Sequence, residues 1–182
     1  MKQLFLLFLS VIFFFPLSYA QDEVLWMRYS AISPDGNTII FSYKGDLFKV
    51  ASSGGQAVAL TSHDGYEFMP VWSHDGQQIA FASDRNGNFD IYTIPSSGGQ
   101  ATRLTSFSRN EYPWSFSPDN KNILFTSVIM DQASNLMFPR GNLSELYSVP
   151  ARGGRISQIL SSSADMASYT ADGSKLLYQD VK

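Results

Sequence analysis

The sequence predicts an all-β protein, a partial β-propeller built of four-stranded antiparallel blades. The first observation behind this is a short motif that returns four times, with its aspartates 40, 44 and 53 residues apart. Internal periods of roughly 40 to 45 residues with several short strands are typical of propeller blades. The second observation is a pair of glycines after each of the first three copies. The four copies are Ser33-Pro34-Asp35-Gly36, Ser73-His74-Asp75-Gly76, Ser117-Pro118-Asp119-Asn120 and Thr170-Ala171-Asp172-Gly173.

Residues 1–20 predict a secretory signal peptide. Lys2 precedes an apolar run that ends at Phe15, and the small residues Ser18 and Ala20 stand as they do before a cleavage site. The run is shorter than the roughly 18 apolar residues that a membrane anchor needs. We therefore expect an exported protein, periplasmic or secreted, whose mature part at 21–182 has no membrane span.

Each repeat predicts four strands joined by tight turns. In the second repeat we expect them at 68–72, 79–82, 89–94 and 101–105. Asp-Gly, Asn-Gly and Gly-Gly pairs supply the left-handed backbone that tight hairpins require. The second strands are continuously apolar, which indicates strands covered on both faces by neighbouring blades. They read Ile39-Ile40-Phe41, Ile79-Ala80-Phe81, Ile123-Leu124-Phe125 and Leu176-Leu177-Tyr178.

The repeats place blades at approximately 28–61, 67–105 and 112–160, and an incomplete blade at 166–182. Propellers close with about four to eight blades, and this chain supplies about three and a half, so we expect an open ring. An open ring exposes a strand edge and a blade face, and both promote association. We expect the rest of a longer chain to supply the missing blades, and self-association into a homo-oligomer is the alternative.

The third repeat carries an insertion between its second and third strands, roughly from Ile129 to Leu143. Long loops on a rigid scaffold often carry binding residues. A neutral surface insertion is the other interpretation, because added loop length costs little free energy.

Antiparallel pairing sorts the loops onto two rims of the disc. Asp-Gly and Gly-Gly turns fall on one rim, and the connections between second and third strands and between blades fall on the other. The second rim gathers aromatic and arginine side chains, which are enriched where proteins bind partners. We predict that a peptide or protein partner contacts this rim through Tyr66, Arg85, Arg109, Glu111, Tyr112, Phe138 and Arg140.

The composition excludes several classes of function. The chain has no cysteine, which rules out thiolate metal sites and cysteine nucleophiles. Its formal net charge is −3 at pH 7, and its 13 lysines and arginines form no cluster. Nucleic-acid binding needs a basic patch, so we expect no nucleic-acid partner, and we expect no cofactor and no metal.

Two motifs invite a chemical interpretation and are better explained as turns. His63-Asp64 and His74-Asp75 lie near serines, yet neither pair accompanies the activated nucleophile of a catalytic triad. Two histidines also fall short of the ligands that zinc prefers. The stretch from Asp84 to Asp90 resembles the start of a calcium loop. Phe89 and Pro95, however, stand where that loop requires glycine and glutamate.

Several stretches carry a resemblance to a known family. The opening stretch at 25–36, followed by 40–47, resembles the start of tricorn-type proteases, as do 81–87 and 145–150. The Ser-Pro-Asp-Gly signature alone is shared with TolB-like and prolyl-oligopeptidase-type propellers. The opening stretch together with the third-blade insertion is more specific. His74, in place of the usual turn proline, is a minor departure from the pattern.

The resemblance implies a large serine peptidase with N-terminal propellers, a PDZ-like module and catalytic domains nearer the C-terminus. It also implies that the propellers dock and filter peptides. No catalytic motif of the family matches a position in this chain, so we assign no catalytic residue. We expect a non-catalytic scaffold and peptide-docking segment of an exported peptidase. The alternatives are a TolB-like module that binds an envelope protein outside any enzyme, and a truncated product without a function of its own.

Overall fold

The structure is a computed structural model that describes residues 26–128 and 144–180. Within these ranges the chain forms thirteen strands and no helix. Accordingly, no helix of the described part is long and apolar enough to cross a membrane. The expected signal peptide and the expected insertion both lie outside the described residues.

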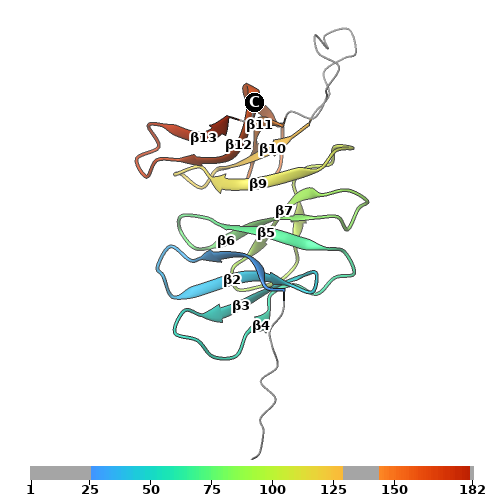
Figure 1. The fold of residues 1–182 in the computed structure, drawn as a ribbon, viewed down its shortest axis with the longest axis vertical. Helices are drawn as coiled ribbons and strands as arrows, with labels where there is room; N and C mark the ends of the chain where they lie inside the picture. The colour runs from blue at the N-terminus through green and yellow to red at the C-terminus, as the bar shows by residue number, and fades with distance from the viewer. Residues whose placement is uncertain (1–25, 129–143, 181–182) are drawn as a thin grey trace, which may run out of the picture.

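The strands pair into three antiparallel sheets, coloured from blue to red in chain order in Figure 1. The first sheet holds β1 (Arg28–Ile32), β2 (Thr38–Tyr43), β3 (Asp46–Ala51) and β4 (Val58–Ala59). The second holds β5 (Glu67–Trp72), β6 (Gln78–Ser83), β7 (Asp90–Pro95) and β8 (Thr102–Arg103). The third holds β9 (Glu111–Phe116), β10 (Asn122–Ser127), β11 (Glu145–Pro150), β12 (Ser157–Tyr169) and β13 (Leu176–Asp180).

The long strand β12 joins what the sequence separates into two blades. Its first part pairs with β11, from Ser157 to Ser163, and its second part pairs with β13, from Ala164 to Tyr169. The sequence places one blade end at 160 and the next blade start at 166. No glycine or proline interrupts this stretch, and the backbone therefore continues as one extended strand.

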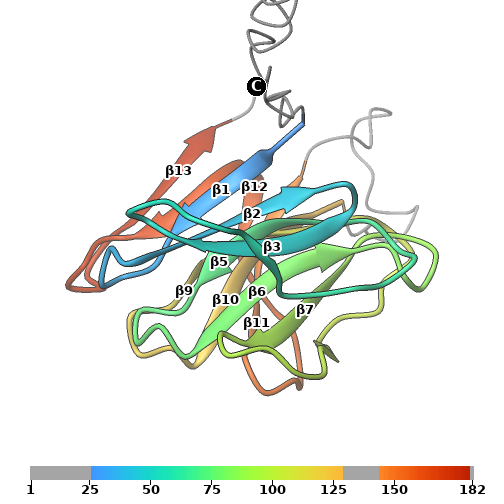
Figure 2. The ribbon, with the colours of Figure 1, turned by 90° about the horizontal axis from the view of Figure 1, so that it is seen from below.

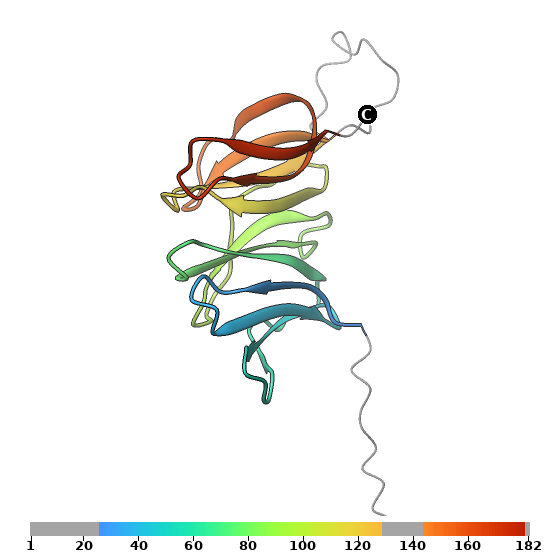
Figure 3. The same cartoon turned by 60° about the vertical axis from the view of Figure 1, so that its left-hand side comes forward.

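The sheets stack face to face in chain order, with the first and third at opposite ends of the stack (Figures 1 and 3). Figure 2 shows the stack from the side of the first sheet. The first strands β1, β5 and β9 contact one another in succession. Buried apolar clusters fill the space between successive sheets. The fold class predicted from the sequence, all-β with four-stranded antiparallel blades in an open arrangement, is confirmed.

The second strands of the first three repeats are buried, as their apolar sequences predict. The aromatic residue of each one stacks on a ring of the third strand at the directly paired position. Phe41, Phe81 and Phe125 are 6%, 0% and 0% exposed. The stacked pairs are Phe41–Phe48, Phe81–Tyr92 and Phe125–Tyr147, with ring centroids 6.1, 5.8 and 5.7 Å apart.

The repeated motif forms the turn between the first two strands of each repeat. In the first copy the Ser33 hydroxyl donates to Asp35 Oδ1 at 2.5 Å and accepts from the Thr38 amide at 2.9 Å. The Ser33 hydrogen bond, together with those from Asn37, lowers the pKa of Asp35 to about 2. Thr170 lowers the pKa of Asp172 to about 2 in the same way. The motif is therefore a structural turn rather than a set of titrating groups.

The turns of successive repeats lie against each other at the second and fourth motif positions. The site of a Cβ on Gly76 would lie 3.8 Å from Pro34, and that on Gly173 would lie 3.0 Å from Pro118. Between the second and third sheets both motif positions differ, because histidine replaces the proline and Asn120 replaces the glycine. The His74 amide, which a proline would lack, donates to Asn120 Oδ1 at 2.7 Å.

Candidate functional site

The structure brings the connections between strands together on one rim of the molecule, which we call the connection rim. It comprises the β2–β3 turn at 44–45, the links at 61–66 and 105–110, and the β6–β7 link at 84–89. The pairing of the strands explains this placement. Arg28, at the start of β1, lies opposite Ser42, near the end of β2, and Glu67, at the start of β5, lies opposite Ser83, at the end of β6. The connections that enter the first strands and leave the second strands therefore lie at the same end of each sheet. Hydrogen bonds tie the neighbouring segments together, for example from the Glu67 amide to the Gly45 carbonyl at 2.7 Å.

Five aromatic rings from three sheets form one continuous cluster on this rim, which we call the aromatic cluster. Phe68 lies at its centre, 8% exposed, and its ring centroid is 4.7 Å from that of Phe89. The other rings are 5.1 to 5.9 Å from Phe68, at Tyr29, Tyr66 and Tyr112. Tyr29 and Tyr66 are 46% and 41% exposed. The cluster therefore has a buried base and two tyrosines that face solvent.

A β-bulge aims Tyr29 at this cluster. Tyr29 has a φ of 53° and lies at the shift in register between β1 and β2. Met69 and Met166 occupy the same position in later first strands, with φ of 53° and 51°. Side chains at bulges are turned away from the regular alternation of a strand. The recurring bulge is thus what carries the Tyr29 ring across to Phe68 of the next sheet.

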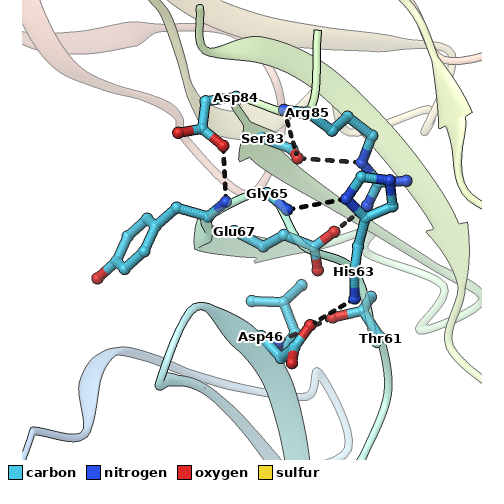
Figure 4. A network of polar contacts seen from close by, with 10 residues as sticks. Asp46, Thr61, His63, Gly65, Glu67, Ser83, Asp84 and Arg85 are labelled. Carbon is cyan, nitrogen blue, oxygen red and sulfur yellow. Dashed lines mark hydrogen bonds and ion pairs between the residues drawn. The ribbon is translucent and has the colours of Figure 1, made fainter. Parts of the chain in front are cut away.

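Beneath the rim surface lies a buried ion pair between Arg85 and Glu67 (Figure 4). The Arg85 side chain is 15% exposed, and that of Glu67 is 0% exposed. The Arg85 Nε atom also donates to the Ser83 hydroxyl at 3.1 Å. Its guanidinium lies over the Tyr92 ring, 4.6 Å from the centroid. Burial lowers the pKa of Arg85 from its ordinary value, and the ion pair holds the guanidinium in place.

Backbone hydrogen bonds fix the link that carries Tyr66. Its amide donates to Asp84 Oδ1 at 2.6 Å, and the His63 amide donates to Asp46 Oδ1 at 3.0 Å. The His63 ring accepts from the Gly65 amide at 2.9 Å. Figure 4 shows these segments meeting around the ion pair. A Cβ on Gly65 would lie 2.9 Å from the Arg85 Cα, so only glycine permits this approach of the two loops.

A second buried carboxylate, Glu111, lies at the start of β9. Its side chain accepts a hydrogen bond from the Thr105 hydroxyl, which itself accepts from the Ile91 amide at 2.8 Å. Its other oxygen, Oε1, has no hydrogen-bond partner among the described residues. Burial, helped by the nearby charge of Asp90 and opposed by the hydrogen bond from Thr105, raises the pKa of Glu111 to about 7.

The neighbouring groups of the second sheet are also buried and charged. Asp90 is 0% exposed and pairs with Arg103 at 2.7 Å. Burial raises the pKa of Asp90, and the Arg103 charge acts in the opposite direction. Burial likewise raises the pKa of the Tyr92 hydroxyl. Asp90 and Tyr92 thus lie inside the second sheet and not on the surface of the connection rim.

The residues that the sequence predicts for the rim fall into three groups: exposed or clustered on the rim, enclosed within it, and outside the described residues. Tyr66 and Tyr112 lie in the aromatic cluster, and Arg109 is exposed, its carbonyl accepting from Asn88 at 2.8 Å. Arg85 and Glu111 also belong to the rim; Glu111 is buried, and the side chain of Arg85, 15% exposed, pairs with Glu67. Phe138 and Arg140 lie outside the described residues.

Sequence reasoning missed three rings of the aromatic cluster, namely Tyr29, Phe68 and Phe89. The repeat does contain a spacing that indicates where part of this cluster lies. Thr61 and Thr105 are each followed six residues later by a glutamate, and then by Phe68 or Tyr112. Both threonines accept from the amide at the second residue of a third strand, Leu47 at 2.9 Å and Ile91 at 2.8 Å. This spacing marks the start of each first strand, where the rings lie.

Other parts of the described chain provide weaker candidates for a functional site. No group of three or more histidines, aspartates or glutamates is placed to hold a metal ion within 26–128 and 144–180. Two grooves open on the opposite rim, of about 730 and 690 Å³. The larger lies between the first and second sheets beside Lys49, whose Nζ donates to the Ser96 carbonyl at 3.2 Å. Turn residues line both grooves, and neither contains a cluster of rings.

Comparison with known protein families identifies the chain as a β-propeller domain. A family model for the tricorn protease N-terminal β-propeller domain matches residues 25–182. The chain belongs to this family. A search among curated proteins finds no match.

Solved structures with the same fold include TolB proteins and tricorn protease. A protein described as TolB from Agrobacterium tumefaciens is 25% identical, with a TM-score of 0.68 over 83% of this chain and 53% of its own. TolB from Acinetobacter baumannii is 24% identical, with a TM-score of 0.66 over 84% and 37%. Tricorn protease is 15% identical, with a TM-score of 0.53 over 68% and 13%. The chain thus spans about half of the first structure and less of the others.

Proposed function

We propose that this chain is a non-catalytic propeller segment of an exported, tricorn-like serine peptidase, and that it docks extended peptides on its connection rim. The observation that carries the proposal is the aromatic cluster, because it joins three sheets and exposes Tyr29 and Tyr66 above a buried base. Rigid aromatic side chains give large contact area at low entropic cost, and they dominate many binding surfaces.

The buried network below the cluster supports the same proposal. The ion pair of Arg85 and Glu67 and the close approach of Gly65 hold the loop that carries Tyr66. A docking surface on fixed loops loses less entropy when a peptide binds. The described residues carry no set of nucleophile, base and orienting group, so peptide cleavage would belong to catalytic domains elsewhere. The signal peptide predicted at residues 1–20 supports a place in the periplasm or outside the cell.

Binding of a labelled peptide to purified variants tests the docking proposal. We expect a short unstructured peptide with aromatic and aliphatic side chains to bind the protein, with fluorescence anisotropy as the readout. Tyr66→Ala and Tyr29→Ala should each weaken the affinity by about tenfold. The control is Val58→Ala on β4, an exposed apolar residue away from this rim. Equal affinities for all four proteins, with unchanged circular dichroism, would refute docking at the cluster.

A second candidate is a TolB-like module that binds an envelope protein and belongs to no enzyme. The observation that favours it is the greater likeness to TolB, at 25% identity and a TM-score of 0.68, than to tricorn protease. A stable protein complex from envelope extract that is lost in Tyr66→Ala and kept in Val58→Ala would support this candidate. Cleavage of the labelled peptide by the full product of the gene would support the peptidase.

A further inference from the structure

We infer that Glu111 couples peptide docking on the connection rim to pH, because it holds the aromatic cluster in its docking arrangement only while its carboxyl group carries a proton. This inference rests on the proposed function and adds a form of regulation to the same site. An exported protein meets the pH of its surroundings, so the coupling would act where we propose that the chain works.

Glu111 joins three segments that lie beneath the aromatic cluster. Its carboxyl group accepts a hydrogen bond from the Thr105 hydroxyl, and that hydroxyl accepts from the Ile91 amide of β7 at 2.8 Å. The Glu111 amide donates to the Phe89 carbonyl at 2.8 Å, and the next residue along β9 is Tyr112. Two rings of the cluster, Phe89 and Tyr112, therefore depend for their position on the residue that carries this carboxyl group.

The equivalent glutamate of the second sheet shows how Glu111 differs. Glu67 also begins a first strand opposite the last serine of a second strand, as Glu111 lies opposite Ser127. Glu67 pairs with Arg85, which stands two residues after its serine (Figure 4). The sequence has Ile129 two residues after Ser127. Within the described residues no salt bridge joins a cation to Glu111, so a proton rather than an arginine neutralises this second glutamate.

The surroundings of Glu111 disfavour a negative charge. The residue is 0% exposed, and its Oε1 atom has no hydrogen-bond partner among the described residues. Removing a carboxylate from water without a compensating cation or a full set of hydrogen bonds is costly. Burial is accordingly the largest cause that raises the pKa of Glu111 to about 7.

The charges of the neighbouring elements do not reverse this effect. Asp90 raises the pKa of Glu111 further, and the hydrogen bond from Thr105 acts against it. The nearby arginines of the second sheet, Arg85 and Arg103, form their ion pairs with other carboxylates. The charged and titratable groups of the elements around Glu111 are Glu67 of β5, Arg85 of the β6–β7 link, Asp90 and Tyr92 of β7, Arg103 of β8, Arg109 of the preceding link and Asp165 of β12.

Loss of the proton should loosen the rim. The ionised carboxylate reaches water only by leaving its buried position, which breaks the hydrogen bond from Thr105 and displaces the start of β9 with Tyr112. A docked peptide covers the rings and keeps water away, so it binds the protonated form. When only that form docks, a pKa of about 7 lowers the affinity by about tenfold between pH 6 and pH 8.

A peptide without titratable groups tests this coupling. It carries aromatic and aliphatic side chains, blocked ends and a label whose emission does not change with pH, so that any pH dependence belongs to the protein. Fluorescence anisotropy should give an affinity about tenfold lower at pH 8 than at pH 6. Glu111→Gln should bind equally at both pH values. Asp64→Asn, an exposed change on the same rim, should keep the difference, and circular dichroism at each pH checks that every protein is folded.

Calorimetry of the unmodified protein gives a second readout that needs no variant. Docking near pH 7 should take up protons, so the binding enthalpy should change with the ionisation enthalpy of the buffer. Equal affinities at both pH values, or docking without proton uptake, would overturn the coupling and leave the docking proposal intact, provided that Tyr66→Ala still weakens binding. An undiminished pH dependence in Glu111→Gln would overturn it as well. A peptide that does not bind at either pH would refute docking itself, and the coupling with it.

Discussion

At the residue scale, His74 and Asn120 show how two departures from a repeated motif compensate each other. At the two other contacts between turns a proline and a glycine occupy these positions, and the proline ring lies beside the glycine backbone. Here a hydrogen bond of 2.7 Å from the His74 amide to Asn120 Oδ1 replaces that contact. Asn120 has a φ of 58°, a conformation that costs a non-glycine residue about 1 kcal/mol. The hydrogen bond offsets that strain.

A double-mutant cycle tests this coupling. We expect Asn120→Gly to stabilise the His74→Pro variant by about 1 kcal/mol, because it relieves strain where the hydrogen bond is already absent. In the unmodified protein Asn120→Gly should be neutral or destabilising, since the hydrogen bond is lost. The coupling measured by urea unfolding is then about 0.5 to 1.5 kcal/mol. Purely additive changes would show that the two residues act independently.

Glu111 gives the protein a stability that depends on pH. Its pKa is raised from 4.5 to about 7 by burial, so between these values the folded protein holds a proton that the unfolded chain releases. Stability must therefore fall as pH rises through this window, by an amount on the order of 3 kcal/mol. The raised pKa of Asp90 acts in the same direction. The lowered pKa values of Asp35 and Asp172 act only at lower pH.

Substitution of Glu111 by glutamine isolates its contribution. We expect urea unfolding of Glu111→Gln to differ much less between pH 5 and pH 8 than that of the unmodified protein. The amide keeps the shape of the side chain and its bond to Thr105 without a charge to desolvate. Asp64→Asn, an exposed change on the same rim, should leave the difference intact. The same pH dependence in both variants would assign the effect to another group.

At this scale, the sequence does not predict in which direction the side chains of loop residues point. Tyr66 and Tyr112 lie in the aromatic cluster as part of the rim that the sequence singles out, whereas Arg85 turns inward to Glu67. Strand periodicity gives the face of a residue, but Arg85 follows a strand and lies in a loop. Its direction depends on a buried glutamate from another strand, which residue spacing alone does not reveal.

At the element scale, the tolerance of the tight turns to substitution depends on how closely the turn of the neighbouring repeat approaches. Gly36 and Gly173 have φ of 74° and 70°, so alanine is strained at both. Nothing lies within 4 Å of a Cβ on Gly36, whereas a Cβ on Gly173 would be 3.0 Å from Pro118. The two glycines share a backbone conformation and differ in their surroundings.

Alanine at these two positions separates strain from packing. We expect Gly36→Ala to destabilise the protein by about 1 kcal/mol through strain alone. Gly173→Ala should cost roughly 1 kcal/mol more, because the turn must also move away from the third-sheet turn that carries Pro118. Thermal unfolding measures both variants. Equal losses would mean that the contact between the two turns adjusts without cost.

The strands follow from the sequence far better than their boundaries do. The second and third strands are fixed by apolar runs and by the aspartate and glycine turns on either side, and the structure shows them paired as β2–β3, β6–β7 and β10–β11. The continuous strand β12 is different. Its residues 161–165 are small or polar and contain no turn signal, so the repeat period alone suggested a break that the backbone does not make.

At the scale of the whole molecule, stability should be greatest in the middle of the stack. The second strands β6 and β10 are paired on both sides and almost wholly buried. In the described chain β13 pairs only with β12, and it is exposed from Leu177 to Asp180. In stacked repeats each unit gains stability from its neighbours, so a unit with one neighbour opens more readily.

Hydrogen exchange tests this gradient directly. We expect the paired amides of β6 and β10 to exchange at least about a hundredfold more slowly than those of β13, because buried strands open only with most of the fold and an edge strand opens locally. Leu124 of β10 packs against Ala164 and Ala167 of β12, and β12 is the strand with which β13 pairs. Leu124→Ala should therefore speed exchange in β13 more than in β6, by weakening the neighbour on which β13 depends. Uniform exchange across β6, β10 and β13 would show instead that the three sheets unfold as a single cooperative unit.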